Sequence, residues 1–272
     1  MVVQHNLTAM NSNRMLGLTT KTQSKSTEKL SSGYKINRAA DDAAGLAISE
    51  KMRRQVRGLT QASANAQDGI SAVQTAEGAL NEVHDMLQRM NELAVKAANG
   101  TNQDEDKSYI QAEVDNLITE IDRVATTTTF NQKALLNGTF SSVELQVGAE
   151  AAAGNQIKVT IENMDSTGLA VATIDVSATG DAKGAINVIK TAITSLSNQR
   201  SNLGAIQNRL EHTINNLNNV VENTQAAESQ IRDTDMATEM VKYSNNNILA
   251  QAGQAMLAQS NQANQGVLSL LQ

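Results

Sequence analysis

The chain has 272 residues, of which 40% are hydrophobic and 18% charged, and its formal net charge is −6. It contains no Cys, which excludes disulfides, thiolate metal sites and Cys nucleophiles. Aromatic residues make up 2% of the chain and Pro is absent. Aliphatic side chains must therefore form any core, and long helices are favoured because an internal Pro costs about 3 kcal/mol.

The charges are unevenly distributed along the chain. Residues 1–60 hold ten Lys and Arg against four Asp and Glu, so they carry a net charge of +6 and the remaining residues carry −12. A basic end without interleaved aromatic residues does not favour nucleic-acid binding. No stretch is long and apolar enough for a transmembrane helix, and the first 30 residues lack the apolar region of a signal peptide. We expect neither a nucleic-acid partner nor a membrane partner.

The two ends of the chain form weakly amphipathic patterns. Leu7, Met10 and Leu18 recur at helical spacing near the amino end, as do Leu249 and Met256 near the carboxyl end, and nothing after residue 242 is charged. Helices with so little apolar face do not fold securely alone. We expect them to become ordered when they pack together or against other copies of the chain.

A seven-residue hydrophobic repeat predicts a long coiled-coil-like helix from Asp42, a candidate N-cap, to Asn99-Gly100, a helix stop. A second repeat lies within 203–231, and a shorter helix is predicted between about 101 and 129. Antiparallel packing of these helices would bury the repeats in one seam. The residues assigned to this rod seam are Met52, Leu59, Val73, Leu80, Leu87, Leu203, Leu210 and Leu217.

The middle of the chain has a different pattern. Short alternating runs at 143–147 and 157–161, punctuated by Gly, predict two or three β-strands in hairpins over about 138–180. This insert is too small for a core of its own and should pack on the helices. The predicted fold class is therefore mainly α: a long antiparallel coiled-coil-like helical rod from both chain ends, with a small β-hairpin region in the middle.

Several long motifs resemble those of bacterial flagellin. Residues 30–49, LSSGYKINRAADDAAGLAIS, are similar to its amino-terminal signature, and 209–217, RLEHTINNL, to its carboxy-terminal counterpart. Residues 231–237, IRDTDMA, and 267–271, VLSLL, resemble the closing segment. The resemblance covers essentially the whole chain, without the large outer variable domains of many flagellins.

The resemblance implies domains and a role. Residues 1–41 and 233–272 would form the two halves of an inner terminal-helix domain, and 42–232 the helical rod. The chain would be exported unfolded by the flagellar type III apparatus, be secreted, and polymerise with itself into the extracellular filament used for swimming. The residues expected to mediate self-assembly are Leu7, Met10, Leu18, Leu249, Met256, Val267, Leu268, Leu270 and Leu271.

Further partners are implied by the same resemblance. They are an export chaperone at the segment 233–272, the filament cap, the hook-junction proteins, and the vertebrate flagellin-sensing Toll-like receptor. The segment 88–95, QRMNELAV, resembles the receptor-binding segment of flagellins. Arg89 and Leu93, one helical turn apart, could share a face with a bidentate Arg fork. The receptor-contact candidates are Arg89, Leu93, Glu113, Gln88 and Glu92.

Other classes of protein fit less well. A signalling coiled coil, such as a chemoreceptor hairpin, shares the heptads but predicts a membrane anchor or helix throughout. A type III needle or hook-junction protein shares the terminal helices but usually lacks both flagellin signatures. We predict no catalytic residue, no metal site and no cofactor, because the three His are far apart in sequence and the Gly-rich pieces lack a phosphate-binding Gly-Lys-Ser/Thr.

Overall fold

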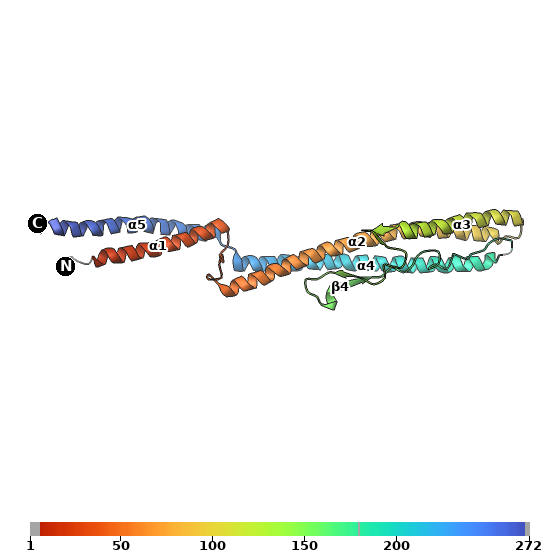
Figure 1. Cartoon of the computed structure of the whole chain (residues 1–272), viewed down its shortest axis with the longest axis horizontal. Coiled ribbons are helices and arrows are strands. Elements are labelled where there is room, and N and C mark those ends of the chain that lie inside the picture. Colours follow the sequence, from red (N-terminus) through yellow and green to blue (C-terminus); the bar gives the residue numbers. More distant parts are fainter. Residues whose placement is uncertain (1–5, 179, 270–272) are drawn as a thin grey trace. The chain divides into compact units, whose positions relative to one another are not determined.

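The computed structural model describes residues 6–178 and 180–269 and shows a mainly helical chain (Figure 1). The helices are α1 (Leu7–Ser32), α2 (Ala43–Ala97), α3 (Asp104–Thr127), α4 (Ala182–Arg232) and α5 (Met236–Ser269). The strands, all between α3 and α4, are β1 (Thr129–Phe130), β2 (Lys133–Ala134), β3 (Val143–Gln146) and β4 (Gln156–Val159). The predicted fold class, with helices packed antiparallel and small β-hairpins in the middle, is confirmed.

The chain divides into two compact units. The terminal unit comprises residues 1–54 and 223–272, and the bundle unit comprises residues 55–222. Helices α2 and α4 contribute residues to both units. The functional domains expected over 1–41, 42–232 and 233–272 stay predictions.

The ends of the long helices follow from local capping chemistry. The carboxylate of Asp42 accepts a hydrogen bond of 2.9 Å from the backbone N–H of Gly45, as an N-cap residue does, and α2 begins at the next residue. At the other end, α2 stops at Ala97, just before Asn99-Gly100. Both ends lie where the sequence predicts them.

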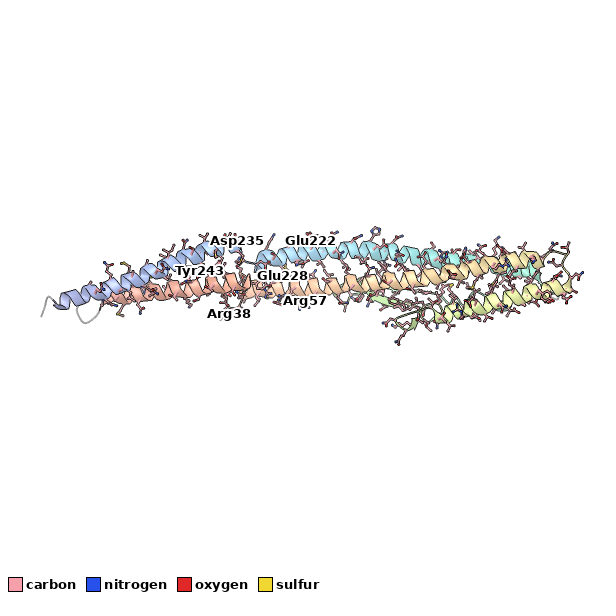
Figure 2. The ribbon with its side chains drawn as sticks, turned by 90° about the horizontal axis from the view of Figure 1, so that it is seen from above. Arg38, Arg57, Glu222, Glu228, Asp235 and Tyr243 are labelled. Carbon is pink, nitrogen blue, oxygen red and sulfur yellow. The ribbon has the colours of Figure 1, made fainter. Side chains whose placement is uncertain are left out.

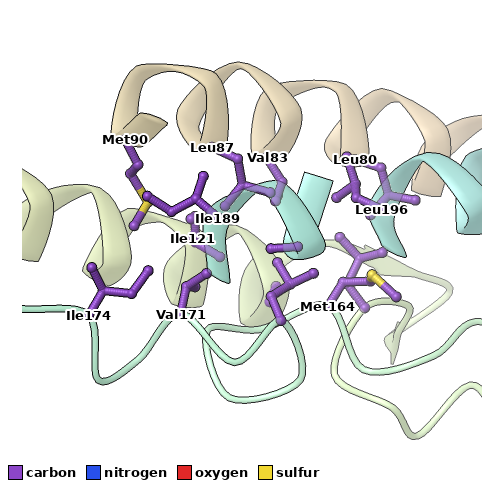
Figure 3. Packing of buried hydrophobic residues seen from close by; sticks show 14 of the residues in the cluster. Leu80, Val83, Leu87, Met90, Ile121, Met164, Val171, Ile174, Ile189 and Leu196 are labelled. Carbon is purple, nitrogen blue, oxygen red and sulfur yellow. The ribbon is translucent and has the colours of Figure 1, made fainter. Parts of the chain in front are cut away.

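The bundle unit contains the main hydrophobic core. Fully buried side chains of α2, including Leu80, Leu87 and Met90, point toward Ile121 of α3 and Leu196 of α4 (Figure 3). The connection between the hairpins and α4 closes the same core with Met164, Val171 and Ile174. Full burial of each such side chain contributes about 1.5–3 kcal/mol of transfer free energy.

The β3–β4 hairpin packs directly on α2. Its strands are antiparallel, with Leu145 opposite Ile157. The side chain of Leu145 occupies the space that a Cβ atom at Gly69 would need, and Asn65 donates a hydrogen bond of 3.0 Å to the Gln146 carbonyl. A glycine at this position of the heptad repeat therefore allows the hairpin to approach the helix closely.

The segment after β4 is attached to the helices by polar side chains. The carboxylate of Asp122 accepts hydrogen bonds from the backbone N–H and the hydroxyl of Ser166, at 2.8 and 2.9 Å. Gln199 donates to the Thr160 carbonyl at 3.0 Å. These bonds satisfy backbone groups that regular secondary structure leaves unpaired.

The terminal unit is built differently. Helices α1 and α5 lie side by side and antiparallel (Figure 1), so that Asn6 meets Ser260 at one end and Ser26 meets Glu239 near the other. Of the buried hydrophobic residues in the described ranges, only Ile36 and Ala250 belong to this unit. Within 6–178 and 180–269, no helix has the length and apolarity that crossing a membrane would require.

Candidate functional sites

The paired helices α1 and α5 expose a large amount of apolar surface. Most of the large hydrophobic side chains that are exposed in the described part of the chain lie on these two helices. They are Leu7, Met10, Met15 and Leu18 of α1 and Met236, Met240, Val241, Ile248, Leu249 and Met256 of α5. Exposed apolar surface of this extent indicates a protein–protein contact.

The structure therefore places Leu7, Met10, Leu18, Leu249 and Met256 at the surface of the terminal unit. Val267 and Leu268 belong to α5, but their side chains lie outside the described residues, as do Leu270 and Leu271 altogether. Met15, Met236, Met240, Val241 and Ile248 were not among the residues predicted for self-assembly. Met236 and Met240 stand four positions apart in α5, which is a helical spacing that the sequence already shows.

Two apolar hollows lie along this helix pair. One, of about 630 Å³, is lined by Leu30 of α1 and by Met236, Met240 and Tyr243 of α5. Figure 2 shows Tyr243 on α5. The other, of about 310 Å³, lies between Met15 and Leu16 on one side and Leu249 and Met256 on the other. Hollows lined this way can accept apolar side chains from a partner.

A buried polar contact lies between the same two helices. The hydroxyl of Ser26 donates a hydrogen bond of 2.6 Å to Glu239, and both residues are buried. Lys242 lies 3.6 Å from the second carboxylate oxygen of Glu239. Because a buried carboxylate is costly without partners, this contact favours one alignment of α1 against α5.

Arg232, the last residue of α4, links the end of that helix to the connection between α1 and α2. Its guanidinium lies 4.7 Å from the centroid of the Tyr34 ring and donates a hydrogen bond of 2.8 Å to Glu50. Its carbonyl accepts a hydrogen bond of 2.6 Å from the N–H of Lys35. These residues are far apart in sequence, so no spacing rule could bring them together beforehand.

Charged partners stabilise this junction further. The hydrogen bond from Arg232, more than the neighbouring charge of Arg53, holds the pKa of Glu50 below its ordinary value of 4.5. Just before α5, Asp235 accepts hydrogen bonds from the hydroxyl of Thr238 and the N–H of Ala237, and these bonds lower its pKa. Glu228, near the end of α4, and Asp235, just before α5, lie on the two sides of the short connection between these helices (Figure 2).

The receptor-contact candidates gather where α2 meets α3. The guanidinium of Arg89 on α2 donates to Glu113 of α3 through Nε at 2.9 Å and Nη2 at 2.8 Å. It also donates to Glu92 at 3.1 Å, and the two partners raise the pKa of Arg89, Glu113 more than Glu92. Gln88 is exposed beside it.

Leu93 does not share that exposed face. It is only 3% exposed and belongs to the hydrophobic core, because the side of α2 that it occupies faces the bundle. Arg89 and Leu93 therefore do not share one exposed face, and the receptor contact stays a prediction. Of the residues assigned to the seam, Met52 is half-buried, and the buried ones are Leu59, Val73, Leu80, Leu87, Leu203, Leu210 and Leu217.

No constellation for metal binding stands out. Among the residues that the structure describes, no group of three or more His, Asp or Glu side chains could hold a metal ion. The candidate interaction sites are the α1–α5 surface, the Arg232 junction and the Arg89–Glu113 pair.

Comparisons with known proteins agree along the whole chain. The profile of the bacterial flagellin N-terminal helical region matches residues 3–141, and that of the C-terminal helical region matches residues 186–271. A flagellin of Halalkalibacterium halodurans is 53% identical, and the flagellar filament 31.3 kDa core protein of Treponema maltophilum is 49% identical. Both alignments cover all of this chain and all of the relative.

A solved structure is also similar. The crystal structure of Bacillus cereus flagellin aligns with a TM-score of 0.50 and 31% identity, covering 57% of this chain and 88% of that chain. Two family profiles that together match most of the sequence, and relatives about half identical over their full length, leave one family. The chain belongs to the bacterial flagellins.

Proposed function

We propose that this chain polymerises through its terminal unit into the flagellar filament, of which flagellins are the structural subunits. One observation carries the proposal: the apolar side chains that α1 and α5 expose outnumber those that they bury. A two-helix layer has only one interface of its own, so the outer faces remain open until other copies cover them. Burial of those faces supplies the free energy of assembly.

Seeded polymerisation tests this proposal. Purified subunits would be mixed with short filament fragments and examined by negative-stain electron microscopy. We expect long uniform filaments from the full chain and none from a chain that lacks residues 233–272. A full chain that stays monomeric or dimeric when seeded would contradict the proposal and favour a junction or signalling protein.

Export through the flagellar type III apparatus would deliver the subunit outside the cell in an unfolded state. The composition supports this route, because a chain without Cys and Pro has neither a disulfide nor slow prolyl isomerisation to delay unfolding and refolding. Secretion would be compared in cells with and without an active export apparatus. Equal amounts of the chain in both culture media would contradict this route.

The segment 233–272 would bind an export chaperone before assembly, and the filament cap and hook-junction proteins would contact the subunit during it. The exposed apolar face of α5 supports the chaperone contact, since an amphipathic helix can lie in a groove of a partner. Copurification of the chaperone with the full chain, but not with the chain lacking 233–272, tests this step. The two roles of the segment are separated in time.

A second proposed role is contact with the vertebrate flagellin-sensing Toll-like receptor. The Arg89–Glu113 pair favours it, because both side chains are held at the surface by bonds between α2 and α3. Gln88 and Glu92 would extend this surface, and Leu93 would hold α2 in place from the core. Binding to the receptor ectodomain would be compared for the unchanged chain, Arg89→Ala and a matched control, Arg123→Ala.

Arg123 is a suitable control because it is equally an exposed helix arginine, paired only with Glu120 of its own helix. We expect Arg89→Ala to weaken binding at least about tenfold, as for a central interface arginine, and Arg123→Ala to leave it unchanged. Equal effects of the two substitutions would remove the specific role of Arg89.

A further inference from the structure

The exposed apolar side chains of the terminal unit include five methionines. Met10, Met15, Met236, Met240 and Met256 are 49–65% exposed. Of the three methionines in the bundle unit, Met90 and Met164 are buried and Met86 is half-buried. Since the chain has no Cys, thioethers are its only sulfur groups. The sulfur chemistry available to an outside reagent is therefore concentrated on α1 and α5.

Four of these methionines line the two apolar hollows in pairs. Met15 of α1 and Met256 of α5 both line the smaller hollow. Met236 and Met240 lie one turn apart in the larger hollow, next to Leu30. Methionine is flexible and polarisable, so it suits a surface that must fit several neighbours.

We propose that Met15, Met236, Met240 and Met256 form an oxidation-sensitive site, and that their conversion to sulfoxides by a hydroperoxide in the free subunit prevents its polymerisation. The inference rests on the proposed self-assembly through the terminal unit. It adds a modification that would regulate the same surface.

The reaction is complete with hydrogen peroxide as the oxidant. A lone pair of the thioether sulfur attacks one peroxide oxygen, an S–O bond forms, and the O–O bond breaks. The departing hydroxide takes up the proton of the transferred oxygen and leaves as water. The sulfur loses two electrons and the peroxide gains them, so no other reactant is needed.

Oxidation changes what the hollows can accept. A sulfoxide is polar and chiral, whereas the side chains around it are mainly apolar. When a second copy covers the hollow, the S=O group loses its water. The hydroxyls of Thr19 and Thr27 in the lining already donate to carbonyls of their own helix. Each oxidised copy would therefore assemble poorly, although its own bundle unit stays folded because its core methionines, Met90 and Met164, are buried.

The same geometry predicts a difference between free and assembled subunits. In the free subunit, the four methionines are 49–58% exposed. In the polymer, the neighbouring copies that cover the hollows would shield them. Oxidation would then act on subunits before assembly and spare completed filament.

The experiment uses the full chain. Monomer is treated with hydrogen peroxide, the excess is destroyed with catalase, and the subunits are seeded with fragments of untreated filament. Sedimentation measures polymer yield, and peptide mass spectrometry maps the added oxygen atoms. We expect the yield to fall at least about tenfold, because each copy loses apolar contacts at several positions. Treatment with both stereospecific methionine sulfoxide reductases should restore it.

Two variants make the assignment specific. The variant Met15→Leu, Met236→Leu, Met240→Leu, Met256→Leu keeps the surface apolar but cannot be oxidised there, so it should polymerise equally before and after peroxide. The matched variant Met90→Leu, Met164→Leu keeps the four thioethers and should lose polymerisation as the unchanged chain does. If the first variant does not assemble before treatment, the unchanged chain tests the inference instead: the reductases should restore its polymerisation after peroxide.

Several results would overturn the inference. They are normal polymerisation of a chain oxidised at the four positions, a reductase treatment that removes the oxygens without restoring assembly, and oxidation of assembled filament at the rate of monomer. These failures differ from failure of the proposed function. An untreated chain that does not polymerise when seeded would contradict both proposals, whereas an untreated chain that polymerises leaves only the oxidation effect in question.

Discussion

The two units of this flagellin differ in how far they bury their apolar residues. In the bundle unit, helices α2, α3 and α4 and the β segment enclose one core, and most of its heptad leucines are inaccessible to water. In the terminal unit, two helices pack on each other and leave most of their large hydrophobic side chains exposed or half-buried. A similar helical pattern therefore yields a self-sufficient fold in one unit and an incomplete one in the other.

The number of packing layers decides whether a unit encloses its own apolar residues. A third layer, supplied by α3 and the segment 160–178, covers the bundle of α2 and α4. No third layer covers α1 and α5 among the described residues. The free energy that the bundle unit gains within one chain is left for contacts between chains in the terminal unit.

The strongest test places a charge on each kind of surface. Leu249→Asp puts a carboxylate on α5, where a neighbouring copy would strip its water, so the yield of seeded polymer should fall to background. Val188→Asp is the matched control, since Val188 is also exposed but lies in the bundle unit. Loss of polymer in both variants, measured by sedimentation, would show that the terminal unit has no special role.

A truncation tests the same comparison from the side of stability. Leu87→Ala removes a fully buried side chain of the bundle unit and should lower the free energy of unfolding by about 2–5 kcal/mol. Leu18→Ala removes an exposed one in the terminal unit and should change the monomer by less than about 0.5 kcal/mol. Urea unfolding followed by circular dichroism measures both. Equal losses would mean that Leu18 is covered within the single chain.

The Arg232 junction predicts a smaller, local effect. Arg232→Met removes the cation–π contact with Tyr34, which contributes about 1 kcal/mol, and should speed hydrogen exchange of the amides near Gly33 and Thr234. Arg232→Lys keeps the charge but not the planar group, so its exchange rate should lie between those of the unchanged chain and Arg232→Met. Unchanged exchange in both variants would show that the backbone bonds of the junction suffice.

Acid should weaken the same junction. The pKa of Glu50 is lowered in the folded chain, chiefly by the hydrogen bond from Arg232. Its contribution is therefore fully present above the ordinary glutamate value of 4.5 and is lost as the pH falls through the lowered one. In Glu50→Gln, the acid dependence of exchange at these amides should be smaller. A profile identical to that of the unchanged chain would exclude Glu50 as its source.

The smallest effect on folding is expected at the Arg89 surface. Because the pair with Glu113 is exposed, Arg89→Ala should move the thermal midpoint by no more than about one degree. Differential scanning calorimetry measures this shift. A larger shift would mean that the pair is part of the fold, and any loss of receptor binding would then have to be separated from destabilisation.

The sequence predicted the helices and hairpins well because their signals are local or periodic. Asp42 caps α2, Asn99-Gly100 ends it, and the alternating run at 143–147 becomes β3. The role of Gly69 was less visible, because its reason is the side chain of Leu145, which lies far along the chain.

The candidate sites were harder to predict, because they depend on which side of a helix faces a neighbour. Arg89 and Leu93 stand one turn apart, yet one is exposed and the other buried. The contact of Arg232 with Tyr34 forms where the ends of α1 and α4 lie side by side. Gly33, at a φ of +75°, ends α1. Spacing within one helix carries no information about either arrangement.

The buried contact between Ser26 and Glu239 has a consequence for a repeating structure. If α1 slid by one turn along α5, the carboxylate would lose the hydroxyl that now satisfies it. Apolar contacts alone would tolerate such a slip, and small differences between copies would then add up along a lattice of many identical parts. A single polar contact that permits one alignment keeps the copies interchangeable, so that the spacing error of each subunit is not passed on to the next.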